Sequence, residues 1–98
     1  MKLSDREKYI IERYAEDEET MVLLFAQWCV NNEIDAHELY EKAYPHQPKN
    51  KTLEVALQRT VLKGESELIP KHLVVAVLQA FGNDDLAFEI EQIRTKDE

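Results

Sequence analysis

The sequence is poor in the residues that make tight turns. Only two glycines and three prolines occur among its 98 residues. A β-sandwich or β-barrel needs a turn at each hairpin, and Gly and Pro supply most of those turns. The shortage therefore argues against an all-β fold and favours helices. It also excludes a glycine-rich phosphate-binding loop, which needs glycines at fixed spacing.

Cysteine and long apolar runs are scarce as well. Cys29 is the only cysteine, so no intrachain disulfide can form, and its apolar neighbours predict a buried thiol. This usage is typical of a reducing compartment and predicts a cytoplasmic location. No apolar run approaches the roughly 20 residues that span a bilayer, and the charged residues 1–14 do not resemble a signal peptide. We therefore expect no membrane association.

Positive charge is in short supply, and it is unevenly placed. The formal net charge is −8, with acidic excess in residues 1–20 and 82–98, whereas residues 45–64 carry a net charge of +3. An acidic shell repels phosphate backbones, so we expect no nucleic-acid partner. A helix-turn-helix interpretation of residues 57–78 is poor, because its second helix would present Val, Ala and Leu to the groove.

What the sequence does contain is a series of helix start and stop signals. Ser4 with Glu7 forms a capping box, and Asp35 with Glu38 forms a variant of it. Pro45 ends a helix, because the residue before proline avoids the α region. Asn31 or Asn32, Gly64 and Gly82 are suited to the left-handed residue that follows a helix. These signals and the apolar periodicity predict helices from Ser4 and over about 18–31, 35–44, 51–63, 70–81 and 83–93, a Pro-containing linker at 45–50 and a frayed tail at 95–98.

Two of the expected helices, 18–31 and 70–81, are apolar nearly all round. A helix without a polar face has to be surrounded by other elements. The sequence therefore predicts one all-α domain over residues 1–98, a compact bundle of five or six short helices around these two. Gln27 is the main polar interruption in the first of them.

The segment that follows the first central helix holds the best candidates for a metal site. His37 and Glu41 are one helical turn apart, a spacing that lets two side chains bind one ion. The zinc signature HExxH is absent, since the next histidine is His46, beyond Pro45. An ordinary acidic, solvated helix surface explains the cluster better, so no metal or other cofactor is predicted.

No arrangement of nucleophile and base is visible. Ser4 is expected to cap a helix, Ser66 to tie a turn, and Cys29 to be buried and inert. Paired carboxylates are abundant only because the whole surface is acidic. We expect no enzymatic activity and infer no small-molecule substrate.

Protein binding is the leading hypothesis, because the aromatic content exceeds what one small core needs. Apolar surface left over on a small protein usually marks an interface. The expected role is a small cytoplasmic adaptor or regulator that binds a protein partner, with a homodimer as one form of it. The candidate partner-binding residues are Trp28, Phe81, Phe88, Tyr40 and Tyr44.

Two other hypotheses remain open at the level of sequence. The charge of −8 suits an acidic immunity or mimic protein that neutralises a basic partner. His37 and Glu41 with their acidic neighbours suit a weak metal- or pH-responsive module.

Overall fold

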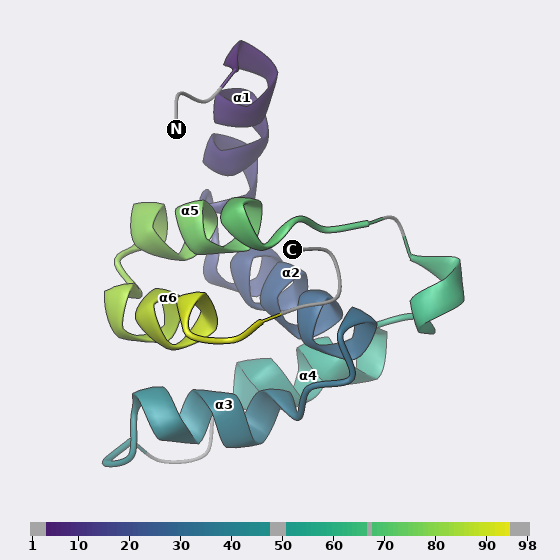
Figure 1. The fold of residues 1–98 in the computed structure, drawn as a ribbon, viewed down its shortest axis with the longest axis vertical. Coiled ribbons are helices and arrows are strands. Elements are labelled where there is room, and N and C mark those ends of the chain that lie inside the picture. The colour runs from purple at the N-terminus through teal and green to yellow at the C-terminus, as the bar shows by residue number, and fades with distance from the viewer. Residues whose placement is uncertain (1–3, 48–50, 67, 95–98) are drawn as a thin grey trace.

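The computed structural model describes residues 4–47, 51–66 and 68–94, and every regular element within those ranges is helical (Figure 1). The prediction of an all-α bundle is thereby confirmed. The described residues form six α-helices and one short 3₁₀ helix: α1 (Asp5–Tyr14), α2 (Glu18–Asn31), α3 (Ala36–Ala43), α4 (Lys51–Arg59), η1 (Lys63–Glu65), α5 (Lys71–Phe81) and α6 (Asp84–Glu91).

Capping side chains start three of these helices, and the sequence predicts two of them, Ser4 and Asp35. Ser4 and Glu7 form both hydrogen bonds of the capping box at α1. The Asp17 carboxylate accepts from the Thr20 amide at 2.7 Å, and Asp35 does the same for Glu38 at 3.1 Å. These carboxylates satisfy amides that have no partner inside the helix and favour its positive end. Several of the chain's acidic residues therefore have a structural role.

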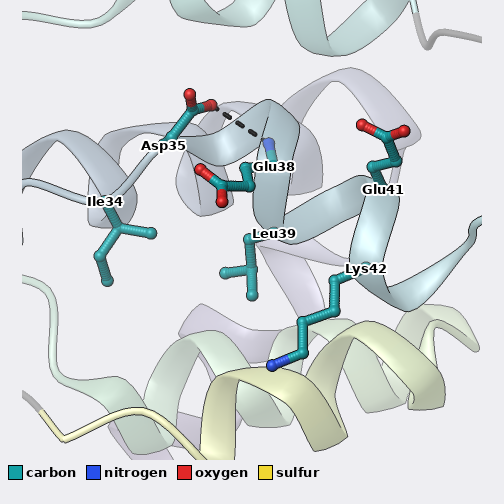
Figure 2. Close-up of a pocket in the computed structure, with 6 residues that line it drawn as sticks. All are labelled: Ile34, Asp35, Glu38, Leu39, Glu41 and Lys42. Carbon is teal, nitrogen blue, oxygen red and sulfur yellow. Dashed lines mark hydrogen bonds between the residues drawn. The ribbon is translucent and has the colours of Figure 1, made fainter.

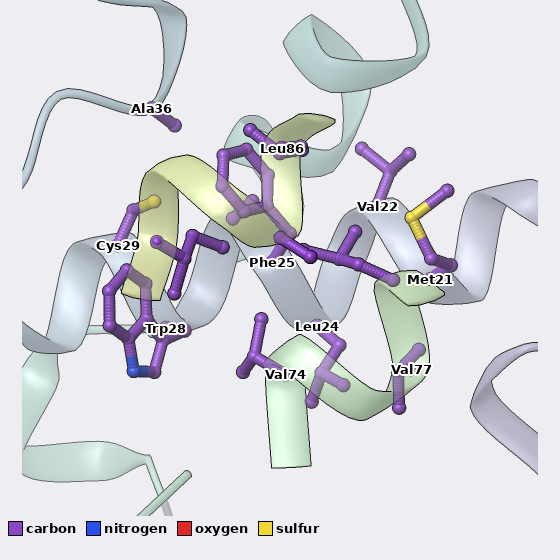
Figure 3. Packing of buried hydrophobic residues seen from close by; sticks show 14 of the residues in the cluster. Met21, Val22, Leu24, Phe25, Trp28, Cys29, Ala36, Val74, Val77 and Leu86 are labelled. Atoms are coloured by element: carbon purple, nitrogen blue, oxygen red, sulfur yellow. The ribbon is translucent and has the colours of Figure 1, made fainter. Parts of the chain in front are cut away.

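Helix α2 is the centre of the fold and contacts α1, α3, α4, α5 and η1. Figure 3 shows its apolar side chains packed against those of α5 and α6. Because α2 is enclosed by neighbours on most sides, it needs no polar face, as the sequence predicts. Its buried residues are Met21, Val22, Leu24, Phe25, Ala26, Trp28 and Cys29.

Helix α5 is less enclosed than α2. It packs on α1, α2 and α6 through Val74, Val75, Val77 and Leu78, while its C-terminal turn is exposed. The two central helices of the sequence prediction thus differ: α2 is surrounded, and α5 covers one side of it.

Helices α5 and α6 form a hairpin. Gly82 has φ of 99°, and the Asn83 amide donates to the Leu78 carbonyl at 2.8 Å, which ends α5 as predicted. At the other end of the hairpin, the Lys71 ammonium donates to the carbonyl of Ile93 at 2.7 Å, beyond the last turn of α6. The start of α5 is thereby held beside the end of α6.

The prediction of a helix over 51–63 is wrong at its C-terminal end, because α4 stops at Arg59. The Leu57 carbonyl, which would accept from the Val61 amide in a longer helix, accepts from the Thr60 hydroxyl at 2.8 Å instead. The Val61 amide donates to Gln27 of α2 at 2.9 Å. Gly64 therefore does not end α4 but lies inside η1.

Two smaller boundary predictions also need correction. Pro70 is the N-cap of α5 rather than its first residue. After α2 the left-handed residue is Glu33, with φ of 58°, and neither Asn31 nor Asn32. The predicted tail at 95–98 and part of the predicted linker, 48–50, lie outside the described residues.

Candidate interaction surface

The connection between α4 and α5, residues 60–66 and 68–70, is fixed to α2 by amide side chains. Gln27 pairs with the backbone of Val61 in both directions: its amide nitrogen donates to the carbonyl at 3.0 Å, and its oxygen accepts from the N–H at 2.9 Å. The same nitrogen donates to Asn31 at 2.9 Å, and Asn31 donates to the Ser66 hydroxyl at 3.1 Å. Gln27, the polar interruption of an apolar helix, thus positions this connection.

These hydrogen bonds keep apolar side chains of the connection exposed to solvent. Leu62 is 72% exposed, Leu68 is 69% exposed and Val61 is 43% exposed. A free loop would be expected to turn such side chains inward, but the paired backbone at Val61 and the bond at Ser66 restrict that movement. The other large apolar side chains that are exposed in the described residues are spread over α1, α4, α5 and α6: Tyr9, Val55, Phe81 and Phe88.

Next to this connection lies a groove of about 510 Å³. It is bounded by α1, by α2, by residues 68–70 and by the first turn of α5, and Leu68 and Ile69 belong to its wall. The surface formed by the connection and this groove is called the apolar face below. The apolar residues that line the groove are Ile10, Tyr14, Leu23, Leu24, Leu68, Ile69, Pro70 and Leu73.

A hydrogen bond crosses from one wall of the groove to another. His72 Nε2 of α5 lies 2.7 Å from Glu7 Oε2 of α1, and both side chains are partly exposed. The bond from His72, together with the Ser4 amide, lowers the pKa of the Glu7 carboxyl below its usual value. Glu7 thus links the start of α1 to the start of α5.

The charges around the groove are mostly positive. Arg6, Arg59, Glu7 and His72 line it, which gives a formal charge of +1 when His72 is neutral. Neither arginine has an ion pair or hydrogen bond within the ranges that the structure describes, in contrast to Glu7. In a chain of net charge −8, two cations without a partner at one apolar groove form a distinct electrostatic feature.

A second hollow, of about 450 Å³, lies beside α3 and has the opposite charge (Figure 2). Ile34 and Leu39 give it an apolar wall. Asp35, Glu38, Glu41 and Lys42 give it a formal charge of −2. Lys42 extends toward α6, where its ammonium lies 3.9 Å from Glu89. A third hollow, of about 520 Å³, lies beside the start of α2 and also contains three carboxylates and Arg59.

Trp28 cannot serve as a partner-binding residue in this structure, which corrects the sequence-based hypothesis. It is 1% exposed and lies within the core (Figure 3). The indole is the largest buried side chain of α2, and burial of its area stabilises the fold. Sequence alone does not distinguish an aromatic residue that fills the core from one that faces a partner.

The two tyrosine candidates are half-buried and hold α3 in place. The Tyr44 hydroxyl donates to Asn83 at 3.1 Å, and burial raises the pKa of Tyr44 above its usual value. The Tyr40 hydroxyl donates to Gln47 at 3.0 Å, and the two rings lie 5.1 Å apart. Both tyrosines also pack against the core, so their contacts explain them without a partner.

Phe88 and Phe81 remain accessible, Phe88 with 61% of its surface in solvent. They lie on the hairpin of α5 and α6, with Phe81 at the opposite end of α5 from the residues that line the groove. The structure therefore separates the aromatic candidates into one core residue, two that pack α3, and two that are open to solvent.

In the described part of the chain, the fold does not complete a metal site around the candidate ligands His37 and Glu41. His37 is partly buried and Glu41 is exposed on α3, and no group of three or more His, Cys, Asp or Glu side chains suited to a metal ion occurs in the described part of the chain. Cys29 is a free, buried thiol, and desolvation raises its pKa well above the usual value. Among the described residues, no helix is both long and apolar enough to cross a bilayer.

The apolar face was missed at the level of sequence because residues 60–63 were assigned to a helix. In a helix Val61 would lie on the buried side, whereas the observed connection turns it outward. The signal that could have located the connection is Gln27 itself, because a buried apolar helix has a use for an amide side chain only where a backbone needs hydrogen bonds.

Two comparisons with known proteins point to the same family. A family model described as YxiS matches residues 2–95. The curated protein "Uncharacterized protein YxiS" of Bacillus subtilis (strain 168) is 51% identical over 82 residues, which is 83% of this chain and 85% of that protein. No solved structure matches the chain.

Proposed function

We propose that this chain, which belongs to the YxiS family, acts by binding another protein through the apolar face and catalyses no reaction. The observation that carries the proposal is the pair of exposed leucines, Leu62 and Leu68, on a connection that Gln27 and Asn31 hold in a fixed position. The support is physical, since neither the family description nor the relative's name states an activity.

Fixing the connection matters energetically for binding. A loop that must become ordered on binding loses conformational entropy, which weakens the complex. Here the Gln27 pair and the Asn31 bond restrict the backbone in the free protein. Leucines presented in this way can bury their area against a partner at about 25 cal/mol per Å² with little further ordering.

The proposal includes a cytoplasmic location. Its support is Cys29, a thiol that is free and buried, as is usual in proteins of reducing compartments.

The test is affinity capture from extracts of the native host with three forms of the full chain. We expect a specific protein to be retained by the wild type, and its retention to fall at least tenfold with Leu62→Ser/Leu68→Ser. Val55→Ser is the matched control, because Val55 is an exposed apolar residue on α4. Equal retention by all three forms, or loss only with Val55→Ser, would place the binding surface elsewhere.

A second candidate function is neutralisation of a basic partner through the hollow at α3. The supporting observation is the acidic rim around an apolar wall, with Glu38 and Glu41 exposed beside Leu39 (Figure 2). Binding of this kind should weaken steeply with salt. It predicts that Glu38→Gln/Glu41→Gln abolishes capture of the partner, whereas Leu62→Ser/Leu68→Ser leaves it intact.

A further inference from the structure

We infer that the partner segment received by the groove of the apolar face is an acidic amphipathic helix. This inference rests on the proposed function and specifies the chemistry of the partner. It joins two features of one site, an apolar lining of about 510 Å³ and two arginines without an ion pair at its border.

The lining explains why the segment is helical. The apolar floor and walls consist of side chains such as Ile10, Leu24 and Leu73, and the described residues contain no β-strand whose edge could pair with an extended peptide. A partner that enters an apolar groove must therefore satisfy its own backbone groups. An α-helix does so, and it presents apolar residues at i, i+3, i+4 and i+7 along one side.

The length of the surface also favours a helix over a small ligand. The groove alone has a volume within the range of small-molecule sites. Leu68 is part of its wall, however, and the exposed Leu62 and Val61 extend the apolar face beyond it along the connection. A helix that lies in the groove contacts Leu68 and Ile69 of the connection together with the walls formed by α1 and α5.

The charges explain why the segment is acidic. Arg6 on α1 and Arg59 at the end of α4 border the groove, and neither side chain forms an ion pair in the described structure, although Arg59 also lines the hollow that contains three carboxylates. Glu7, the acidic residue at the groove, is already bound to Ser4 and His72. At physiological salt the Debye length is about 8 Å, so the charges that line the groove act on a bound helix more strongly than charges elsewhere on the chain.

The experiment uses the full-length ¹⁵N-labelled chain and two designed helical peptides. Both peptides carry leucines at i, i+3, i+4 and i+7; one has glutamates at the remaining positions, and the other has lysines. We expect the glutamate peptide to shift the amide signals of Ile10, Gln27 and Leu73 and to bind at least tenfold more tightly than the lysine peptide. Arg6→Glu/Arg59→Glu should reverse this preference while the spectrum still shows a folded protein.

Several outcomes would overturn the inference. These are tighter binding of the lysine peptide, binding of neither peptide, and shifts confined to α3 or α6. Vesicles that contain phosphatidylglycerol are a further probe, and if they shift the groove signals while the glutamate peptide does not, the ligand is an anionic lipid surface.

The failure of this inference can be told apart from failure of the proposed function. If the host protein captured by the wild type is retained equally by Arg6→Glu/Arg59→Glu but lost with Leu62→Ser/Leu68→Ser, the apolar face binds a partner of different charge. If the Leu62→Ser/Leu68→Ser variant retains the host protein as well as the wild type does, both proposals fail.

Discussion

Helix α2 and the α4–α5 connection are both rich in apolar residues, yet they use them in opposite ways. Side chains of α2 such as Phe25 and Trp28 are almost completely buried. Leu62 and Leu68 of the connection are mostly in solvent. Gln27 belongs to both regions, because it arises from the buried helix and holds the exposed connection in place. Apolar content alone therefore does not distinguish residues that are buried in the core from residues that stay exposed. Here the hydrogen bonds that fix the backbone of the connection make that difference.

The largest effect that the comparison predicts is the loss of Trp28. Trp28→Ala leaves a cavity beside Cys29 in a fully packed core, and such changes cost about 3–5 kcal/mol. We expect a matching fall in the free energy of unfolding in urea. A variant that unfolds at the same urea concentration as the wild type would show that the indole is not part of the core.

A smaller effect is expected when the hydrogen bonds between Gln27 and the backbone of Val61 are removed. Gln27→Ala removes both hydrogen bonds to the backbone of Val61, which should destabilise the protein by about 1–2 kcal/mol and release the connection. Amide hydrogen exchange should accelerate at Val61 and remain slow within α2. Gln27→Glu is a useful second variant, since it keeps the acceptor for the Val61 amide but loses the donor to the carbonyl.

The contact between Glu7 and His72 at the groove wall predicts a pH dependence. The pKa of Glu7 is lowered in the folded state, so its carboxylate contributes stability above its unfolded value of about 4.5, and that contribution disappears as the pH falls through the lower folded pKa. The melting temperature of Glu7→Gln should therefore be below that of the wild type at pH 7, and the difference should shrink as the pH falls below about 4.5. A constant difference across this range would mean that Glu7 acts only through packing.

The smallest effect on stability is expected at the exposed leucines. Leu62→Ser should change the free energy of unfolding by no more than about 0.5 kcal/mol, because the side chain is 72% exposed and loses little burial. Comparing the thermal unfolding of Leu62→Ser with that of Trp28→Ala measures how much more α2 contributes to stability than the exposed connection does. A loss comparable with that of Trp28→Ala would assign Leu62 to the core.

The sequence was sufficient for the helices whose limits are set by local signals. Ser4, Asp17, Asp35 and Gly82 act within one turn of their own helix, so their roles can be recognised without tertiary structure. The end of α4 is different. It depends on Gln27, which is 34 residues from Val61 in the sequence, and no local pattern contains that contact.

The candidate site was predicted less well than the fold for the same reason. Aromatic residues attracted attention at the level of sequence, but Trp28 is enclosed by the bundle, and Tyr40 and Tyr44 are engaged around α3. Residue type gives only a tendency toward burial, and the packing of the helices decides it for each aromatic residue. The exposure of the leucines depends on the path of residues 60–66 and 68–70, which no local pattern predicts.

Site-specific photo-crosslinking in living cells of the native host tests the central claim most directly. A photoreactive amino acid at position 62 should give a discrete crosslinked protein, and the same probe at position 55 of α4 should not. The crosslink at position 62 should weaken in a Gln27→Ala background, which frees the connection without altering the probe. Absence of a discrete product at position 62, or equal products at both positions, would contradict the claim that this fixed apolar connection is a binding surface.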